Sequence, residues 1–208
     1  MSAASQTISD TSATTPQISS LLRIEIAKQV ALALQEDIAT GDINAQLIPD
    51  TQCDTATIIC REPMVVAGKA WVDEVFRQLD PNMQLDWAVK DGDAVAANQI
   101  LVTLIGNTRA LLTGERTALN FLQTLSSTAT VVANHVAVIA ELPTKLLDTR
   151  KTIPMLRHAQ KYAMMCGGCN NHHIRLYDAF LIKENHNMDS GGIAQAVSQA
   201  RKLAKKPV

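Results

Sequence analysis

The stretch of the chain richest in reactive side chains is CGGCNNHHIRLYDAFLIKENH, which runs from Cys166 to His186. It contains two cysteines, three histidines, an arginine and a lysine. Thiolate and imidazole groups in such a stretch can hold a metal ion. The Cys-x-x-Cys spacing can support thiol redox chemistry, and the basic side chains can bind a small anion.

The positions of the cysteines argue against the metal and redox interpretations. A structural zinc ion usually takes its ligands from two separated pairs, but Cys53 and Cys60 lie in a distant part of the sequence with about six residues between them. A redox Cys-x-x-Cys motif opens a helix, whereas Cys166 and Cys169 follow a predicted one. The favoured interpretation is therefore two thiols that line a glycine-rich turn, and no metal site is predicted.

The basic residues gather in one part of an otherwise acidic protein. Residues 1–144 hold 8 Lys and Arg against 16 Asp and Glu, whereas residues 145–186 hold 7 against 3 and include four of the five histidines. A solvated surface is the simple explanation. A compact anion site is the alternative, in which an arginine grips a carboxylate with two hydrogen bonds and lysine or histidine adds further donors. The candidates are Arg150, Lys151, His172 and Lys183.

The elements predicted after Pro143 place these candidates on one edge. The sequence favours a strand over 144–148, a helix from Pro154 to Met165 with Thr152 as its cap, a strand over 179–183 and a helix over 191–206. This alternation predicts parallel strands in a barrel or an open sheet. The carboxyl ends of parallel strands carry the chemistry in such folds. DTRKT follows the first strand and KENH closes the second.

The first half of the sequence predicts a small α+β domain over residues 18–106. A helix is expected over 18–34 and another over 70–79, with short strands near 55–61, 64–68, 85–89 and 99–106. A long helix follows from 107 to about 141, and residues 107–208 are expected to hold this helical linker and the first part of an α/β barrel domain. Arg116 shares a polar face of the long helix with Thr113, Asn120 and Gln123, so it is not expected in the core.

Composition excludes several classes of protein. Aromatic residues make up 3% of the sequence and its formal net charge is −1, so neither a base-stacking surface nor a polyanion-binding field is expected. No apolar run reaches the roughly 18 residues that a membrane span needs. Residues 1–17 are rich in Ser, Thr and Ala and are expected to be a disordered tail, without an apolar signal segment. A cytoplasmic protein with no nucleic-acid or membrane partner is predicted.

Four segments together resemble one enzyme family. EDIATGDIN, LTGERTALNFLQTLSSTAT, LLDTRKTIPMLRHAQKYAMMCGG and NNHH followed by DAFLIKENH are similar to quinolinate phosphoribosyltransferase, also called carboxylating nicotinate-nucleotide pyrophosphorylase. The resemblance implies an N-terminal α+β, hammerhead-like domain and an incomplete parallel α/β barrel. Because the sequence ends after two strand–helix units, we expect an incomplete barrel in a protein truncated at its C-terminal end, with low or no activity alone.

The resemblance also implies an activity and roles for individual residues. Quinolinate and phosphoribosyl pyrophosphate would give nicotinate mononucleotide, pyrophosphate and CO2 in NAD biosynthesis, with Mg²⁺ accompanying the phosphoribosyl donor. A homodimer or larger assembly is implied, in which Arg116 reaches the partner subunit's site. Arg150, His172 and Lys183 would hold quinolinate and Lys151 would contact the phosphoribosyl donor; Lys151 and Lys183 are the catalytic candidates.

Two positions depart from the family's pattern. His173 stands where a substrate-binding arginine is expected, and Arg175 stands where a glycine is expected. His173 remains a substrate-binding candidate, but an imidazole cannot offer the two parallel hydrogen bonds of a guanidinium. A relative that acts on another pyridine acid or is associated with molybdate transport stays open as an alternative. The second alternative is that the protein is a non-catalytic dimerisation partner.

Overall fold

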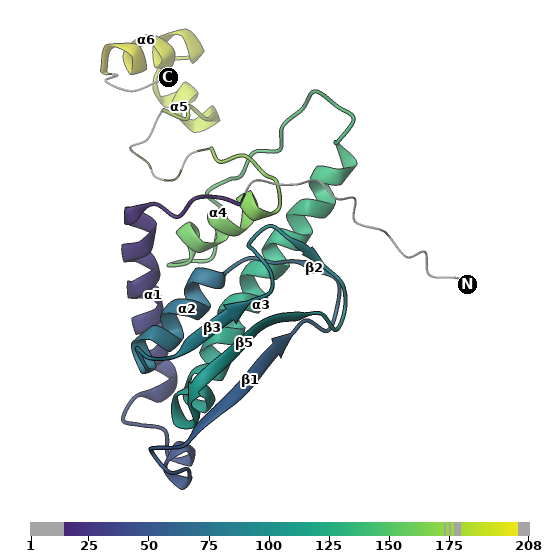
Figure 1. Ribbon diagram of the computed structural model, residues 1–208. Coiled ribbons are helices and arrows are strands. Elements are labelled where there is room, and N and C mark those ends of the chain that lie inside the picture. The colour runs from purple at the N-terminus through teal and green to yellow at the C-terminus, as the bar shows by residue number, and fades with distance from the viewer. Residues whose placement is uncertain (1–14, 173, 175, 177–179, 204–208) are drawn as a thin grey trace, which may run out of the picture.

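The computed structural model describes residues 15–172, 174, 176 and 180–203, and Figure 1 shows their arrangement. Residues 1–14 of the predicted tail, together with His173 and Arg175, lie outside the described residues. The first half of the protein alternates helices with short antiparallel strands. Within the described ranges, no helix combines the length and the apolar character needed to cross a bilayer.

The N-terminal region is an α+β unit, as predicted. Strands β1 (Cys53–Ile59), β5 (Ile100–Asn107) and β3 (Gln84–Trp87) form an antiparallel sheet in the order β1-β5-β3. Strands β2 (Met64–Val65) and β4 (Ala94–Val95) pair separately. Helices α1 (Ser20–Ile38) and α2 (Lys69–Leu79) pack with the sheet around a shared core. The largest fully buried side chains of this region are Trp71, Phe76, Leu101 and Leu104.

Helix α3 (Thr108–Val138) is the long central helix that the sequence predicts. It begins directly after β5, where the Asn107 side chain accepts a hydrogen bond from the amide of Ala110 at 3.2 Å and so caps the helix. Its apolar face includes Ala118, Leu122 and Leu125, which are buried against the N-terminal core. Figure 1 shows α3 running behind the strands and past α4 (Arg157–Cys166). The helix therefore joins the two halves of the protein.

Helix α4 begins later than the sequence predicts. Leu156 is its N-cap and makes no side-chain capping bond, so the expected start at Pro154 with Thr152 as the cap is wrong. The reason is Met155, whose φ of 67° is left-handed and interrupts a helix. The Met155 carbonyl accepts a hydrogen bond at 3.0 Å from the buried side chain of Gln29. A contact with a residue distant in sequence thus holds the turn that delays the helix.

One face of α4 is anchored to the N-terminal unit. The Tyr162 hydroxyl donates to Oδ2 of Asp91 at 2.7 Å, and the Tyr162 ring packs 5.5 Å from that of Trp71 between centroids. The backbone amide of Lys69 donates to the other oxygen of Asp91 at 3.2 Å. Burial raises the pKa of Asp91, an effect that its hydrogen bonds partly oppose. Asp91 therefore depends on these donors whenever it is ionised.

Replacing Tyr162 with phenylalanine is expected to lower the free energy of unfolding by about 1–3 kcal/mol near neutral pH, because the buried Asp91 carboxylate loses a donor. The Tyr162 hydroxyl favours the ionised carboxyl, so its removal raises the already high pKa of Asp91 further. The loss should consequently be smaller near pH 4, where more of the carboxyl is protonated. Urea unfolding of both proteins at the two pH values measures this. An equal loss at both would contradict the argument.

The two strands predicted for the C-terminal half are not formed among the described residues. In the segment 144–148 only Leu147 pairs, through an isolated parallel bridge with Asn170, and residues 180–183 are not in a strand. Residue 179, the first of the second predicted strand, lies outside the described residues. A strand exists only where a neighbouring segment continues the hydrogen-bonded ladder, and no further strand of the described part lies beside these segments. The incomplete parallel barrel therefore stays a prediction.

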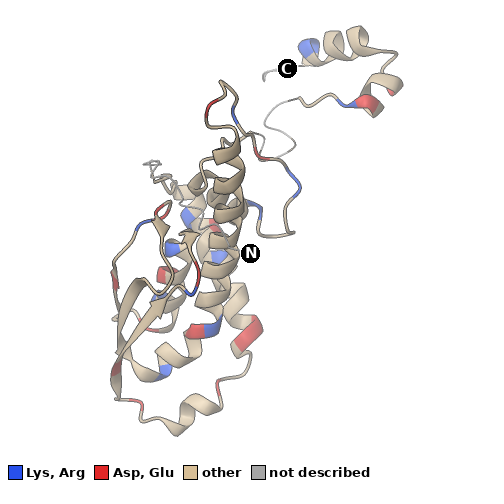
Figure 2. Cartoon of the chain, turned by 90° about the vertical axis from the view of Figure 1, so that its right-hand side faces the viewer, with Lys and Arg blue, Asp and Glu red and all other residues tan. Residues whose placement is uncertain are grey.

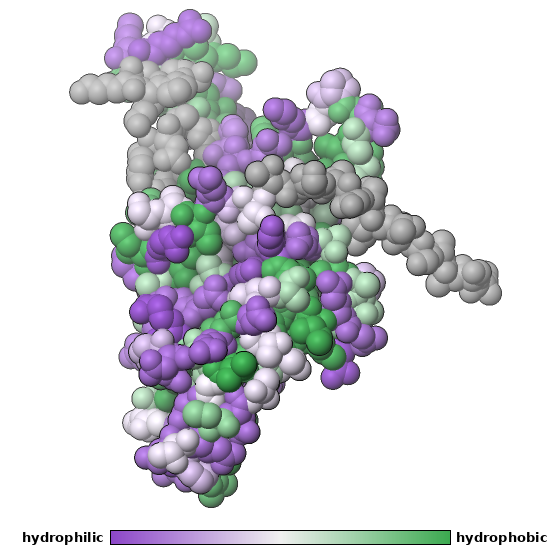
Figure 3. Space-filling model, viewed as in Figure 1, coloured by the Kyte–Doolittle hydropathy of each residue, from purple (hydrophilic) through white to green (hydrophobic). Residues whose placement is uncertain are grey.

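Two helices end the described part. They are α5 (Glu184–Asp189) and α6 (Ile193–Leu203), the second of which lies within the predicted helix over 191–206. Figure 1 shows both apart from the body formed by α1–α4, and Figure 3 shows apolar surface on them. Met188 and Ile193 are 81% and 69% exposed, respectively, and the buried residues of α6 are the two small side chains of Ala196 and Ala200.

Candidate functional site

Two of the loops that carry candidate binding residues lie side by side. The amide of Asp148 donates to the carbonyl of Asn170 at 3.1 Å, and the amide of Asn170 donates to that of Leu146 at 2.9 Å. The thiol of Cys169 adds a third link, to the Leu146 carbonyl at 3.2 Å. The segment that leads into DTRKT and the segment that leads into NNHH are therefore parallel neighbours. The strand ends expected to meet were those of 144–148 and 179–183, and that pairing is not seen among the described residues.

Asp148 also joins these loops through its side chain. Its Oδ1 accepts from Nζ of Lys161 at 2.6 Å and from the backbone amide of His172 at 2.8 Å. The side chains of Asp148 and Lys161 are 0% and 3% exposed. Lys161 projects from α4, so a single carboxylate oxygen connects the two loops to this helix.

Three of the predicted binding residues lie on the joined loops. The Arg150 side chain is half-buried, and its Nε is buried without a hydrogen-bond partner among the described residues. Lys151 is exposed, and its amide donates to the hydroxyl of Thr149 at 3.1 Å in a tight turn. His172 is exposed as well. Figure 2 shows basic residues along the connection from α3 to α4. This arrangement can present several cationic donors to one small anion.

The remaining candidates are placed elsewhere. Lys183 is the exposed N-cap residue of α5, on the segment that leads away from α4. Arg116 is exposed on α3, which confirms that it is not a core residue. Nearby on that helix, Thr113 donates to Asp42 at 2.8 Å. The structure therefore brings together Arg150, Lys151 and His172, with Lys183 and Arg116 on separate elements and His173 outside the described residues.

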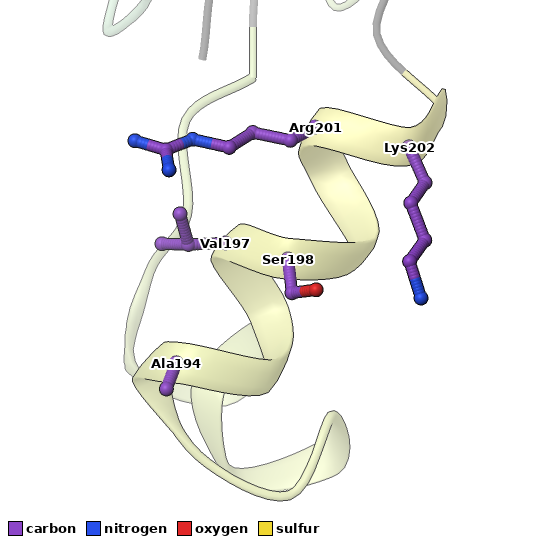
Figure 4. A pocket seen from close by; sticks show the side chains of 5 residues that line it. All are labelled: Ala194, Val197, Ser198, Arg201 and Lys202. Carbon is purple, nitrogen blue, oxygen red and sulfur yellow. The ribbon is translucent and has the colours of Figure 1, made fainter.

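Two hollows of the surface lie away from the joined loops. One, of about 600 Å³, follows a face of α6, and Figure 4 shows its Arg201 and Lys202 pointing to opposite sides. The other, of about 170 Å³, lies between α1, α3 and Leu156 and carries Glu36 and Asp37. The first is lined by a single helix and the second is acidic, so neither suits a small dianion better than the joined loops do.

The protein matches known proteins over nearly its whole length. The N-terminal domain of quinolinate phosphoribosyl transferase matches residues 37–126, and the C-terminal domain matches residues 128–208. A solved nicotinate-nucleotide pyrophosphorylase from Francisella tularensis is 51% identical, with a TM-score of 0.87 over 92% of this chain and 69% of that one. The chain belongs to the quinolinate phosphoribosyltransferase family. The resemblance drawn from the motifs is thereby confirmed, and with it the α+β N-terminal and α/β C-terminal domain classes.

Other family members are similar at lower identity. Probable carboxylating nicotinate-nucleotide pyrophosphorylases from Synechocystis sp. and Bacillus subtilis are 39% and 41% identical, over 84% and 81% of this chain. The match covers 59% and 58% of those proteins, so the chain spans less than two thirds of their length. A solved NadC structure from Streptococcus pyogenes is 34% identical with a TM-score of 0.85, over 90% of this chain and 67% of that one.

The family match places the joined loops in the C-terminal domain and Arg116 in the N-terminal domain. Reasoning from the sequence missed the connection that Asp148 and Lys161 make between the loops and α4. Lys161 lies on an amphipathic helix, where a lysine ordinarily faces solvent. The one available signal was the position of Lys161 beside Tyr162, on the side of the helix that is buried here.

The cysteines near the joined loops have structural surroundings. Cys166 is buried at the end of α4 and Cys169 is buried beneath the loops. Burial raises the pKa of both thiols, so the reactive thiolate is disfavoured. All four cysteines are free, and the described residues contain no group of three or more His, Cys, Asp or Glu side chains that could hold a metal ion.

In the folded protein, Cys53 is expected to react with iodoacetamide at least about tenfold faster than Cys166 or Cys169, because it is exposed on β1 and they are not. Alkylation at pH 7.5, followed by digestion and mass spectrometry of each cysteine peptide, gives the three rates. In urea the three rates should converge. Rapid native labelling of Cys166 would show that its surroundings are open.

Proposed function

We propose that the protein represented by this chain is a quinolinate phosphoribosyltransferase that forms nicotinate mononucleotide for NAD biosynthesis. The observation that carries the proposal is the pairing of the 146–148 and 170–172 segments through hydrogen bonds, which supports Arg150, Lys151 and His172 as members of one site on adjoining loops. Membership of the family supports the choice of substrate, since relatives are named for this activity.

Recognition of quinolinate would rest on the cationic loops. The guanidinium of Arg150 matches the planar geometry of a carboxylate, and its half-buried position strengthens the charge interaction. His172 and Lys183 would bind the second carboxylate, and Lys151 would contact the phosphoribosyl donor. Holding both carboxylates also orients the pyridine nitrogen toward the sugar carbon that it attacks.

The reaction needs charge stabilisation and no side-chain nucleophile. As the bond from C1 of the ribose to pyrophosphate breaks, positive charge grows on the sugar and negative charge on the leaving group, which Lys151 and its basic neighbours would stabilise. The pyridine nitrogen forms the new bond to that carbon. The quaternary ring then accepts the electron pair of the adjacent carboxylate as CO2 leaves, and a proton takes its place.

Magnesium is part of the proposal only as an ion that accompanies the phosphoribosyl donor. Among the residues that the structure describes, no side-chain cluster fits a metal ion, so no step is assigned to it. A homodimer in which Arg116 reaches the partner subunit's site, and a cytoplasmic location, remain predictions. The effect of His173 and Arg175 on quinolinate affinity also remains a prediction.

Titration calorimetry tests the proposal. The protein is titrated with quinolinate and, as the matched control, with nicotinate, which lacks the second carboxylate. We expect quinolinate to bind at least about tenfold more tightly, because one further charged hydrogen-bonded group is worth about 1.5–3 kcal/mol. Equal affinities would favour a relative that acts on another pyridine acid. Dimer formation in light scattering without binding of either acid would favour the non-catalytic partner.

A further inference from the structure

The Asp148–Lys161 pair differs from the other ion pairs in the described part of the protein. Lys28–Glu25 and Arg77–Glu74 join neighbouring turns of single helices, and the basic side chain of each is more than 60% exposed. The side chains of Asp148 and Lys161 are 0% and 3% exposed, and they are thirteen residues apart on different elements. Burying two charges is costly, so the pair is better explained by the geometry that it imposes than by stability.

We propose that the buried Asp148–Lys161 ion pair is a positioning device for the anion site, which locks the loop of Arg150 and Lys151 and the loop of His172 to helix α4. This inference rests on the proposed function, because it concerns how that site is held. Neither residue is expected to touch the ligand.

Helix α4 is a suitable fixed reference for the loops. Tyr162, next to Lys161, is held by Asp91 and Trp71 of the N-terminal unit. On the same helix Arg157 makes a second connection to the same two regions: its Nε donates to the Thr152 hydroxyl at 3.2 Å, and its Nη1 donates to the Ile174 carbonyl at 3.3 Å. Arg157 thus contacts both regions directly, and Lys161 connects them through Asp148.

Because a single oxygen of Asp148 has two partners, this one residue can fix the positions of both loops. Oδ1 of Asp148 accepts from Lys161 and from the amide of His172, so moving the carboxylate moves both partners. Arg150 is only two residues further along the sequence. A shift of about 1 Å at a binding group is enough to weaken its contacts severely.

The pair also sets the charge beside the site. An unneutralised Asp148 carboxylate, so close to His172, would repel a dicarboxylate ligand. Lys161 cancels that charge from the buried side, where it cannot compete with Arg150 or Lys151 for the ligand. Half-buried Arg150 and exposed Lys151 would therefore meet the ligand without an opposing anion.

The experiment compares Lys161→Met, the double variant Asp148→Asn/Lys161→Met and the control Lys28→Met, which removes an exposed pair. The double variant leaves no unpaired buried charge and keeps the protein measurable if Lys161→Met does not fold. Amide hydrogen exchange is followed at Asp148, Asn170 and His172, whose amides bond across the two loops. Quinolinate affinity is measured by calorimetry on the same samples.

We expect both Lys161 variants to lose at least about tenfold of the protection at these three amides and at least about tenfold in quinolinate affinity. Amides of β5 and α2 should keep their relative order of protection, and Lys28→Met should match the original protein in every readout. Unchanged loop protection and affinity in the double variant would overturn the inference.

The two proposals fail in different ways. If the loops loosen in the Lys161 variants but the original protein does not bind quinolinate, the positioning device is supported and the proposed function is wrong for this chain. If the original protein binds quinolinate and the double variant binds it equally well, the function survives and the positioning role is rejected.

Discussion

Replacing Arg150 with alanine is expected to weaken quinolinate binding by about 30-fold or more. Removing one side of a close, partly desolvated charge pair costs about 2–5 kcal/mol, and each 1.4 kcal/mol is a factor of ten. Arg150 meets the condition of partial desolvation, because it is half-buried and its Nε is buried without a partner among the described residues. Calorimetric titration of the variant with quinolinate measures the change.

Two further variants test whether the loss of quinolinate affinity is specific to Arg150 and whether it depends on the shape of the guanidinium. Arg77→Ala removes an arginine from the exposed pair on α2 and should leave the affinity within about twofold. Arg150→Lys keeps the charge but loses the planar fork, so its affinity should lie between those of the original protein and Arg150→Ala. If Arg150→Ala binds quinolinate as tightly as Arg77→Ala does, the ligand is not held by this loop.

The parts of the fold that the sequence predicts well are those with a local cause. Helix α2 and strand β5 follow from sequence signals within about ten residues, and both form where they were predicted. The start of α4 could not be predicted in this way. The left-handed turn at Met155 is held by Gln29 of α1, a residue 126 positions away.

The candidate site shows the same division between features with a local cause and features that depend on contacts distant in sequence. Basic residue types singled out Arg150, Lys151, His172 and Lys183, and their role in binding stays a prediction. The segments that lie side by side are 146–148 and 170–172, not the two predicted strands whose ends were expected to meet. Regular strands were predicted over 144–148 and 179–183 from propensity alone, but among the described residues neither forms, since a strand also needs a partner. The Asp148–Lys161 contact depends on both the bridge at Leu147 and the placement of α4.

The largest expected change in stability is that of Lys161→Met, about 3–5 kcal/mol of unfolding free energy. The substitution leaves the Asp148 carboxylate buried with the His172 amide as its one remaining donor among the described residues, and an uncompensated buried charge is costly. Asp148→Asn should lose stability for the converse reason, because the Lys161 ammonium is then buried without its partner. Urea unfolding followed by circular dichroism measures both.

A double-mutant cycle separates the two sources of this loss. If the cost comes from an unpaired charge, Asp148→Asn/Lys161→Met should be more stable than either single variant, since neither charge remains. If it comes from lost packing, the two losses should simply add. Lys28→Met breaks an exposed pair and should change stability by less than about 0.5 kcal/mol. A double variant that recovers stability while its loops stay loose would show that the pair is kept for geometry, because the fold itself would then be no weaker without the two charges.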